Sequence, residues 1–166
     1  MKKRILNSIG VGVVTVLAIA IFAQVWVSAQ VQDINSEGLV GSWDVTVTPR
    51  DCATGDPAPF PPAFSAVQTY NQGGTMLASV LPTPGILSLD GQGVWSHRKG
   101  RQYSVAFRFV NFNPDGTPAG RNVIRDIVTL ALDSKTYTST GTVDILDSSG
   151  NLILRGCATT SATRFE

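Results

Sequence analysis

Apolar side chains recur at every second position from Gly38 onward, and this period limits the fold more than any other feature of the chain. Residues 43–48 and 102–109 show it most clearly, with a valine or an aromatic residue alternating with a polar or small one. A period of two is typical of half-buried β-strands, because successive side chains of a strand point to opposite faces of the sheet. No amphipathic helix of ordinary length is visible, so the sequence predicts an all-β fold.

Turn signals divide the same region into about eight strands joined by short connections. The glycines of Gln72-Gly73-Gly74 and the segment Asn113-Pro114-Asp115-Gly116 are typical of tight hairpin turns. Strands are expected at residues 41–48, 64–71, 75–81, 94–97, 102–109, 124–132, 137–146 and 152–165. Consecutive hairpins favour an antiparallel up-and-down β-barrel, since only the proline-rich segment 49–62 is long enough for the crossover of a sandwich. Closure would place the first strand beside the last and remove both sheet edges.

Both ends of the predicted barrel resemble a known family. Gly41-Ser42-Trp43 resembles the Gly-x-Trp motif that opens the first strand of lipocalins and their calycin relatives, and Arg164 resembles the arginine of their last strand. The resemblance implies an eight-stranded barrel in which Arg164 packs across Trp43 and the interior holds a small hydrophobic molecule. The chain is also similar to small exported bacterial lipocalin-like proteins in Gly93-Val94-Trp95, Gly156-Cys157-Ala158-Thr159 and Arg164-Phe165-Glu166. The helix that flanks the barrel of classical lipocalins is not visible before Glu166.

The first 29 residues have the layout of a secretory signal peptide. Met1-Lys2-Lys3-Arg4 is basic, residues 5–23 are almost wholly apolar, and Val27-Ser28-Ala29 supplies small residues for cleavage. We expect cleavage after Ala29, a short polar tether at 30–37 and a barrel domain at 38–166, exported to the periplasm or the medium. The alternative is an anchor that is kept in the inner membrane, because the apolar stretch approaches the roughly 20 residues that span a bilayer. After cleavage, no association with the membrane is expected.

Cys52 and Cys157 are the two cysteines of the chain. In an exported protein two cysteines predict one disulfide, because the compartment outside the cytoplasm lets the bond persist. Cys52 follows the first predicted strand and Cys157 lies in the last one, so the bond would join strands that closure brings together. A free, reactive thiol is the alternative.

Composition argues against several classes of function. The net charge of +1 includes the basic N-terminus, and only residues 97–101 concentrate basic side chains, which is too little for a nucleic-acid partner. His97 is the single histidine, so a multi-histidine metal site is excluded, and no metal or other cofactor is predicted. No Gly-x-Ser-x-Gly elbow occurs, and Ser96 and His97 point to opposite faces as neighbours in a strand. The sequence does not indicate an oligomeric state.

The candidate ligand-binding residues are inward-facing aromatics and two polar groups. The aromatics are Tyr103, Phe107, Phe109 and Tyr137. Asp126 shares the parity of the inward residues of its strand, but it lies near the predicted start, so we expect it in water at the barrel rim. Burial is the alternative, and it would require a partner or a raised pKa. His97, beside a basic turn, could orient a polar group near a rim; as a general base it would need a positioned partner.

Three functions follow from these observations. The favoured hypothesis is an exported barrel, not an enzyme, that binds a small, largely hydrophobic molecule in its interior. The second is an isomerase or cyclase on a lipid substrate, similar to allene oxide cyclase, which would need polar groups aimed at a reacting centre. The third is a non-catalytic interaction module of the cell envelope that uses the loops or the barrel exterior.

Overall fold

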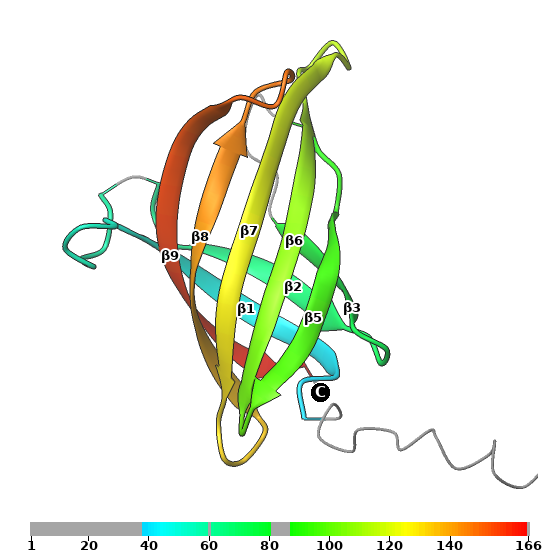
Figure 1. Cartoon of the computed structure of the whole chain (residues 1–166), viewed down its shortest axis with the longest axis vertical. Coiled ribbons are helices and arrows are strands. Elements are labelled where there is room, and N and C mark those ends of the chain that lie inside the picture. The colour runs from blue at the N-terminus through cyan, green and yellow to red at the C-terminus, as the bar shows by residue number, and fades with distance from the viewer. Residues whose placement is uncertain (1–37, 60, 81–86, 166) are drawn as a thin grey trace, which may run out of the picture. The chain divides into compact units, whose positions relative to one another are not determined.

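The computed structural model describes residues 38–59, 61–80 and 87–165 (Figure 1). The predicted signal peptide at 1–29 and tether at 30–37 lie outside these residues. The described chain forms nine β-strands: β1 (Gly41–Arg50), β2 (Phe64–Tyr70), β3 (Thr75–Val80), β4 (Leu87–Ser88), β5 (Gly91–Lys99), β6 (Gln102–Phe112), β7 (Pro118–Leu130), β8 (Thr136–Leu146) and β9 (Leu152–Arg164). No helix in this described part is long and apolar enough to cross a membrane.

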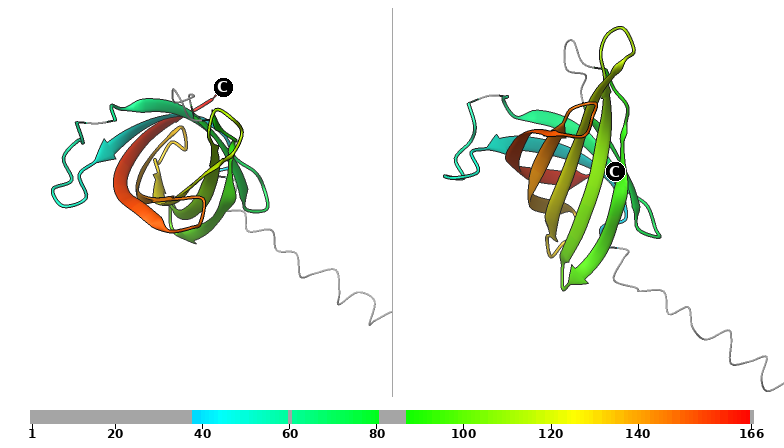
Figure 2. Two further views of the ribbon diagram at one scale, coloured as in Figure 1. Left: turned by 90° about the horizontal axis from the view of Figure 1, so that it is seen from above. Right: turned by 45° about the horizontal axis from the view of Figure 1, so that its top comes forward.

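The strands pair antiparallel in chain order and close into a barrel. β1 pairs with β2 on one side and with β9 on the other, from Trp43 opposite Arg164 to Arg50 opposite Cys157. The short β4 pairs with β6 beyond the end of β5, so β4 and β5 together occupy one position in the wall. Seen from above, the strands form a ring (Figure 2). The fold is therefore an eight-stranded, antiparallel, closed β-barrel, as the sequence predicts.

β5 begins at Gly91, three residues before the start expected from the sequence. Gly91 and Gly93 belong to this strand; Gly91 lies against the Phe109 ring, and Gly93 lies against the Ala106 carbonyl and the Cα and Cβ atoms of Phe107. A Cβ at Gly91 would lie 2.8 Å from the Phe109 ring, and a Cβ at Gly93 would overlap Phe107. The two glycines thus serve close packing of a strand on aromatic side chains, which is a second common use of glycine besides turns.

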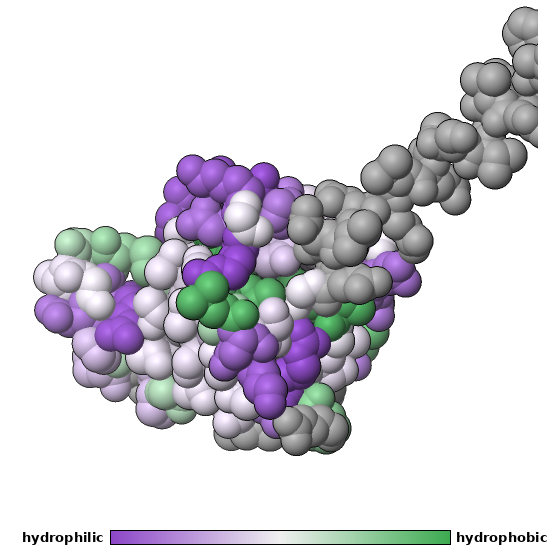
Figure 3. All heavy atoms as spheres, turned by 90° about the horizontal axis from the view of Figure 1, so that it is seen from below, coloured by the Kyte–Doolittle hydropathy of each residue, from purple (hydrophilic) through white to green (hydrophobic). Residues whose placement is uncertain are grey.

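The closed half of the barrel contains the most tightly buried side chains. It is lined by Leu39, Trp43, Tyr70, Met76, Trp95, Tyr103, Val128, Leu130 and Tyr137, none of them more than 5% exposed. The polar atoms of its indoles are paired: Trp43 Nε1 donates to the Leu39 carbonyl at 3.0 Å, and Trp95 Nε1 donates to the Asn71 carbonyl at 3.0 Å. Figure 3 shows this end from below, with apolar atoms in the middle of the described surface and hydrophilic residues around them.

Arg164 closes this end in the way that the family resemblance implies. Its guanidinium carbon lies 4.2 Å from the ring centroid of Trp43. Its nitrogen atoms donate to the carbonyl oxygens of Gly38, Val40 and Ser134 at 2.6 to 3.0 Å. A stacked, multiply bonded arginine is well suited to hold chain segments that are far apart in the sequence.

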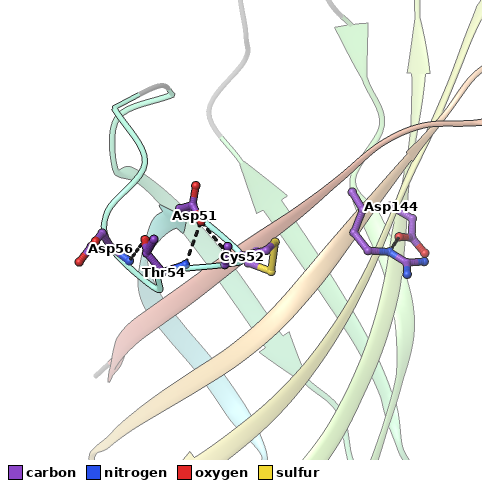
Figure 4. Close-up of a disulfide and its surroundings, with 8 residues drawn as sticks. Asp51, Cys52, Thr54, Asp56 and Asp144 are labelled. Atoms are coloured by element: carbon purple, nitrogen blue, oxygen red, sulfur yellow. Dashed lines mark hydrogen bonds and ion pairs between the residues drawn. A yellow bond between two sulfur atoms is a disulfide. The ribbon is translucent and has the colours of Figure 1, made fainter.

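The predicted disulfide joins Cys52 to Cys157 at the other end of β1. Cys52 lies in the loop between β1 and β2, which projects sideways from the barrel (Figures 1 and 2). Figure 4 shows the turn at this bond: the Asp51 carboxylate accepts from the backbone N–H groups of Ala53 and Thr54 at 2.7 and 3.0 Å. These bonds hold the pKa of Asp51 below its ordinary value. The bond is consistent with an oxidising compartment.

Candidate functional site

The interior of the barrel changes character toward the end that carries the β6–β7 and β8–β9 turns. Val47, Val80, Ile124, Val143, Ile145, Gly156 and Ala158 are inward positions of this open half that are only half-buried, whereas Phe107 and Phe109 of β6 are 7% exposed. Leu154, which pairs with Ile145 at the edge, is 56% exposed. Half-burial of these inward residues is consistent with solvent entering the barrel through this end.

Small residues enlarge the open half. Gly141, Gly156 and Ala158 face inward on β8 and β9, where larger side chains would occupy the interior. On the other side, the rings of Phe107 and Phe109 contact each other edge to face, with centroids 5.7 Å apart, and the Phe109 ring lies against Gly91 of β5. The open half is therefore lined by large apolar side chains on the side of β5 and β6, and by small residues on the side of β8 and β9.

A polar layer separates the closed half from the open half. It consists of inward side chains from four strands: Gln68 and Tyr70 on β2, Asp126 on β7, Tyr137 and Ser139 on β8, and Thr160 on β9. The hydroxyls of Tyr70 and Tyr137 both donate to Gln68 Oε1 at 2.7 Å. Ser139 Oγ and Thr160 Oγ1 are 2.6 Å apart. Among the described residues no buried side-chain nitrogen or oxygen lacks a partner.

Asp126 is the one acidic member of this layer, and its position differs from the expected rim. β7 begins at Pro118 rather than near residue 124, so Asp126 lies well inside the strand. It pairs with Gly141 of β8, and a Cβ at residue 141 would overlap the Asp126 carboxylate. The missing side chain of Gly141 therefore makes the space in which this carboxylate lies.

The surroundings of Asp126 disfavour its charge. Burial raises the pKa of Asp126 from 3.8 to about 6, and a hydrogen bond with the Ser139 hydroxyl partly opposes the shift. When Asp126 is ionised its carboxylate only accepts hydrogen bonds; in that state Ser139 donates to Asp126 and accepts from Thr160. Burial also raises the pKa of Tyr70 and Tyr137 well above its ordinary value, so both phenols stay protonated and act as donors.

The other predicted residues lie in different parts of the barrel. Phe107 and Phe109 line the open half with Asp126, whereas Tyr137 belongs to the polar layer. Tyr103 lies in the closed half, where its ring is 5.7 Å from that of Trp95. His97 is on the same side: its Nε2 is 2.8 Å from the Gly100 carbonyl oxygen, and its ring packs against Tyr103. The structure thus brings three of the six residues to the open half and leaves His97 away from Asp126.

Sequence reasoning missed Gln68, Ser139, Thr160 and the role of Gly141. One signal was present, because Gln68 has the same parity as Ala66 and Tyr70, which are both buried. A polar side chain at an inward strand position has to find a hydrogen-bond partner. Its partner Tyr137 comes from a strand far along the chain, and pairing across the barrel is not visible in a local pattern.

The outer wall offers two shallow, open grooves as alternative sites. One runs over β1, β2, β3, β8 and β9 beside Asp44, and the other runs over β5, β6 and β7 beside Arg125. Their outward side chains are mainly serine, threonine and single aliphatic residues in contact with water. No group of three or more potential metal ligands is found among the described residues. The interior is the stronger candidate, because it combines burial, apolar surface and a desolvated charge.

Comparison with protein-family models, with curated proteins and with solved structures finds no match to this chain. The class of the protein therefore rests on its own geometry. It is an eight-stranded closed antiparallel barrel, consistent with a lipocalin-like fold.

Proposed function

We propose that this protein is an exported, lipocalin-like barrel that binds a small, largely apolar molecule in the open half of its interior. The observation that supports this most is the contrast within one lumen, where half-buried apolar side chains stand above a polar layer whose hydrogen bonds are satisfied. Ligand sites are typically concave and apolar with a few placed polar groups. Export is supported by the layout of residues 1–29 and by the Cys52–Cys157 disulfide.

The aromatic wall and the polar layer have separate parts in this proposal. Phe107 and Phe109 supply flat apolar contact area that is already fixed by packing, so little rotamer entropy is lost on binding. Asp126 and Ser139 lie deeper and orient the polar end of the ligand. Exposed Leu152, Ile153 and Leu154 form part of the edge of the open end, where an apolar molecule would enter.

Binding can be tested with a neutral fluorescent dye, Nile red, displaced by 1-dodecanol. Ala158→Trp places a large ring in the open half, and Ser161→Trp places the same ring on the outer face of β9 as a matched control. We expect Ala158→Trp to abolish Nile red binding, and Ser161→Trp to bind like the wild type. Equal binding by both variants, or no binding by the folded wild type, would refute the proposal.

An isomerase or cyclase on a lipid-like substrate is the second candidate function. It is favoured by one observation, the carboxyl group of Asp126 with a pKa of about 6 at the base of an apolar space. A general base works best when its pKa is close to the working pH. For any substrate found to turn over, Asp126→Asn should abolish turnover while binding persists, and turnover that survives this change would remove the candidate.

A further inference from the structure

We infer that the polar end of the ligand is a cation, and specifically that the open half recognises an amphiphilic amine through Asp126. This inference rests on the proposed interior binding site. It goes further by naming the charge of the ligand. Three features of the described residues support it: the charges inside the barrel, the hydrogen-bond donors of the polar layer, and the space that Gly141 leaves for the Asp126 carboxylate.

The barrel interior holds a negative charge without a counter-charge. Among the described residues both ion pairs involve Asp144, which binds Arg125 and Arg155 on the outer wall. The partly buried Arg164 lies at the closed end. Its guanidinium group stacks on Trp43 and donates to three carbonyl oxygens there, so this cation is already paired. Because isolated buried charges are costly, an interior carboxylate with no cation beside it among the described residues is a site that a cationic ligand would satisfy.

The tyrosine and threonine hydroxyls of the polar layer are committed elsewhere. Both tyrosine hydroxyls donate to Gln68, and the Thr160 hydroxyl is used by Ser139. Asp126 therefore receives a side-chain hydrogen bond from Ser139, although a carboxylate offers about four acceptor sites. A primary ammonium supplies three donors and a positive charge, whereas an alcohol supplies one donor and a carboxylate ligand would be repelled.

The residue opposite Asp126 leaves room for its carboxylate group. Gly141 lies opposite Asp126 across the β7–β8 pair, and any larger residue there would displace the carboxylate. Asp126 itself is half-buried, so this member of the polar layer is partly accessible. An amine whose chain lies along Phe107 and Phe109 would meet the carboxylate at its deep end.

A series of ligands that differ only in the head group tests this inference. Dodecylammonium, 1-dodecanol and dodecanoate, each below its micellar concentration, compete with Nile red at pH 8, where Asp126 is ionised and a primary amine, with an ordinary pKa of about 10, is protonated. We expect the ammonium to bind at least about tenfold more tightly than the alcohol, with dodecanoate weakest, because a charge-assisted hydrogen bond is roughly twice as strong as a neutral one.

Two variants locate the effect. Asp126→Asn keeps the shape and removes the charge, so the ammonium and the alcohol should then bind within about twofold of each other. Asp44→Asn removes the same charge from an exposed position on the outer face of β1, and should leave the preference unchanged. Circular dichroism of each variant confirms that the barrel is folded.

The outcomes separate this inference from the proposed function. If the alcohol or dodecanoate binds the wild type as tightly as the ammonium, or if Asp126→Asn keeps the preference, the cation inference is wrong while interior binding stands. If Nile red and all three ligands fail to bind folded wild-type protein, the proposed function fails and the inference falls with it.

Discussion

The two halves of this barrel are built from the same strands but differ in the size and burial of their inward side chains. In the closed half, large aromatic side chains meet at short distances, as in the 4.8 Å separation of the Trp43 and Tyr137 rings. In the open half the same strands continue with glycine, alanine and half-buried aliphatic residues. A barrel of eight strands is just wide enough to be filled or to hold one small ligand, and the side chains of the two halves differ in the way that these two uses require. The proposed function therefore places stability and binding in different lengths of the same strands.

The largest expected difference between the halves is the cost of removing a side chain. Trp43→Ala should destabilise the barrel by about 3 to 5 kcal/mol, because it leaves a cavity and removes the ring under Arg164. Val143→Ala in the open half should cost about 1 kcal/mol or less, because its side chain is half-buried. Urea unfolding at pH 7 measures both, and similar losses would show that the halves are packed alike.

The disulfide should have the next largest effect, and it tests whether the open half depends on a covalent bond. Replacing Cys52 and Cys157 together by serine should lower the free energy of unfolding by about 2 to 4 kcal/mol, since the bond spans 105 residues. The far-ultraviolet circular dichroism should stay that of a β-protein, because β1 still pairs with β9. An unchanged unfolding midpoint in urea would contradict this account of the bond.

The charge of Asp126 should lower the free energy of unfolding of the protein at neutral pH. Its pKa of about 6 in the folded protein exceeds the ordinary 3.8, so between these values the folded state binds more protons than the unfolded state. The contribution of Asp126 to stability therefore falls as pH rises from about 4 to 7. Asp126→Asn should be more stable than the wild type at pH 8 by roughly 1 to 3 kcal/mol, and the two should converge near pH 4.

The same urea experiment at several pH values checks this prediction. Asp44→Asn is the control, because Asp44 is exposed on the outer wall. A variant Asp126→Asn that is less stable than wild type at pH 8 would mean that the charge of Asp126 is stabilised by the protein.

The smallest expected effect concerns the link between Asp126 and the polar layer. Ser139→Ala removes the donor to Asp126 and the partner of Thr160, and should cost about 1 kcal/mol at pH 7. The pKa of Asp126 should rise further, because the bond with Ser139 lowers it. Carbon-13 NMR titration of the aspartate carboxyl groups measures the pKa of Asp126 directly. An unchanged Asp126 pKa in Ser139→Ala would show that Ser139 does not reach Asp126.

The closure of the barrel, the Trp43–Arg164 contact and the Cys52–Cys157 disulfide were predictable from sequence. All three rest on patterns that are local or lie near the ends of the barrel domain. Alternation identifies β1 and β9, and their pairing then places Trp43 opposite Arg164 and Cys52 near Cys157. The position of Asp126 was not predictable in the same way. Thr117-Pro118-Ala119-Gly120 has the composition of a turn, yet Pro118 starts β7 beside an irregularity in β6, a place where proline is tolerated.

The polar layer was beyond local reasoning for a different reason. Gln68, Ser139 and Thr160 come from three strands, and their hydrogen bonds exist only after the barrel has closed. The start of β5 was also missed, because the sequence does not distinguish a glycine that admits a neighbouring strand, such as Gly91 or Gly93, from one that makes a turn. Both failures concern contacts between strands, which the period of two does not specify.

Methyl NMR of the folded protein tests the central claim, that the open half of the lumen accepts an apolar molecule and the closed half does not. With isoleucine, leucine and valine methyl groups labelled, titration with 1-dodecanol should shift the signals of Val80, Ile124 and Val143. The signals of Leu39, Val128 and Leu130, which are at most 3% exposed in the closed half, should stay in place. Shifts confined to outward residues such as Val67 and Val94, or no shifts at all, would contradict the account.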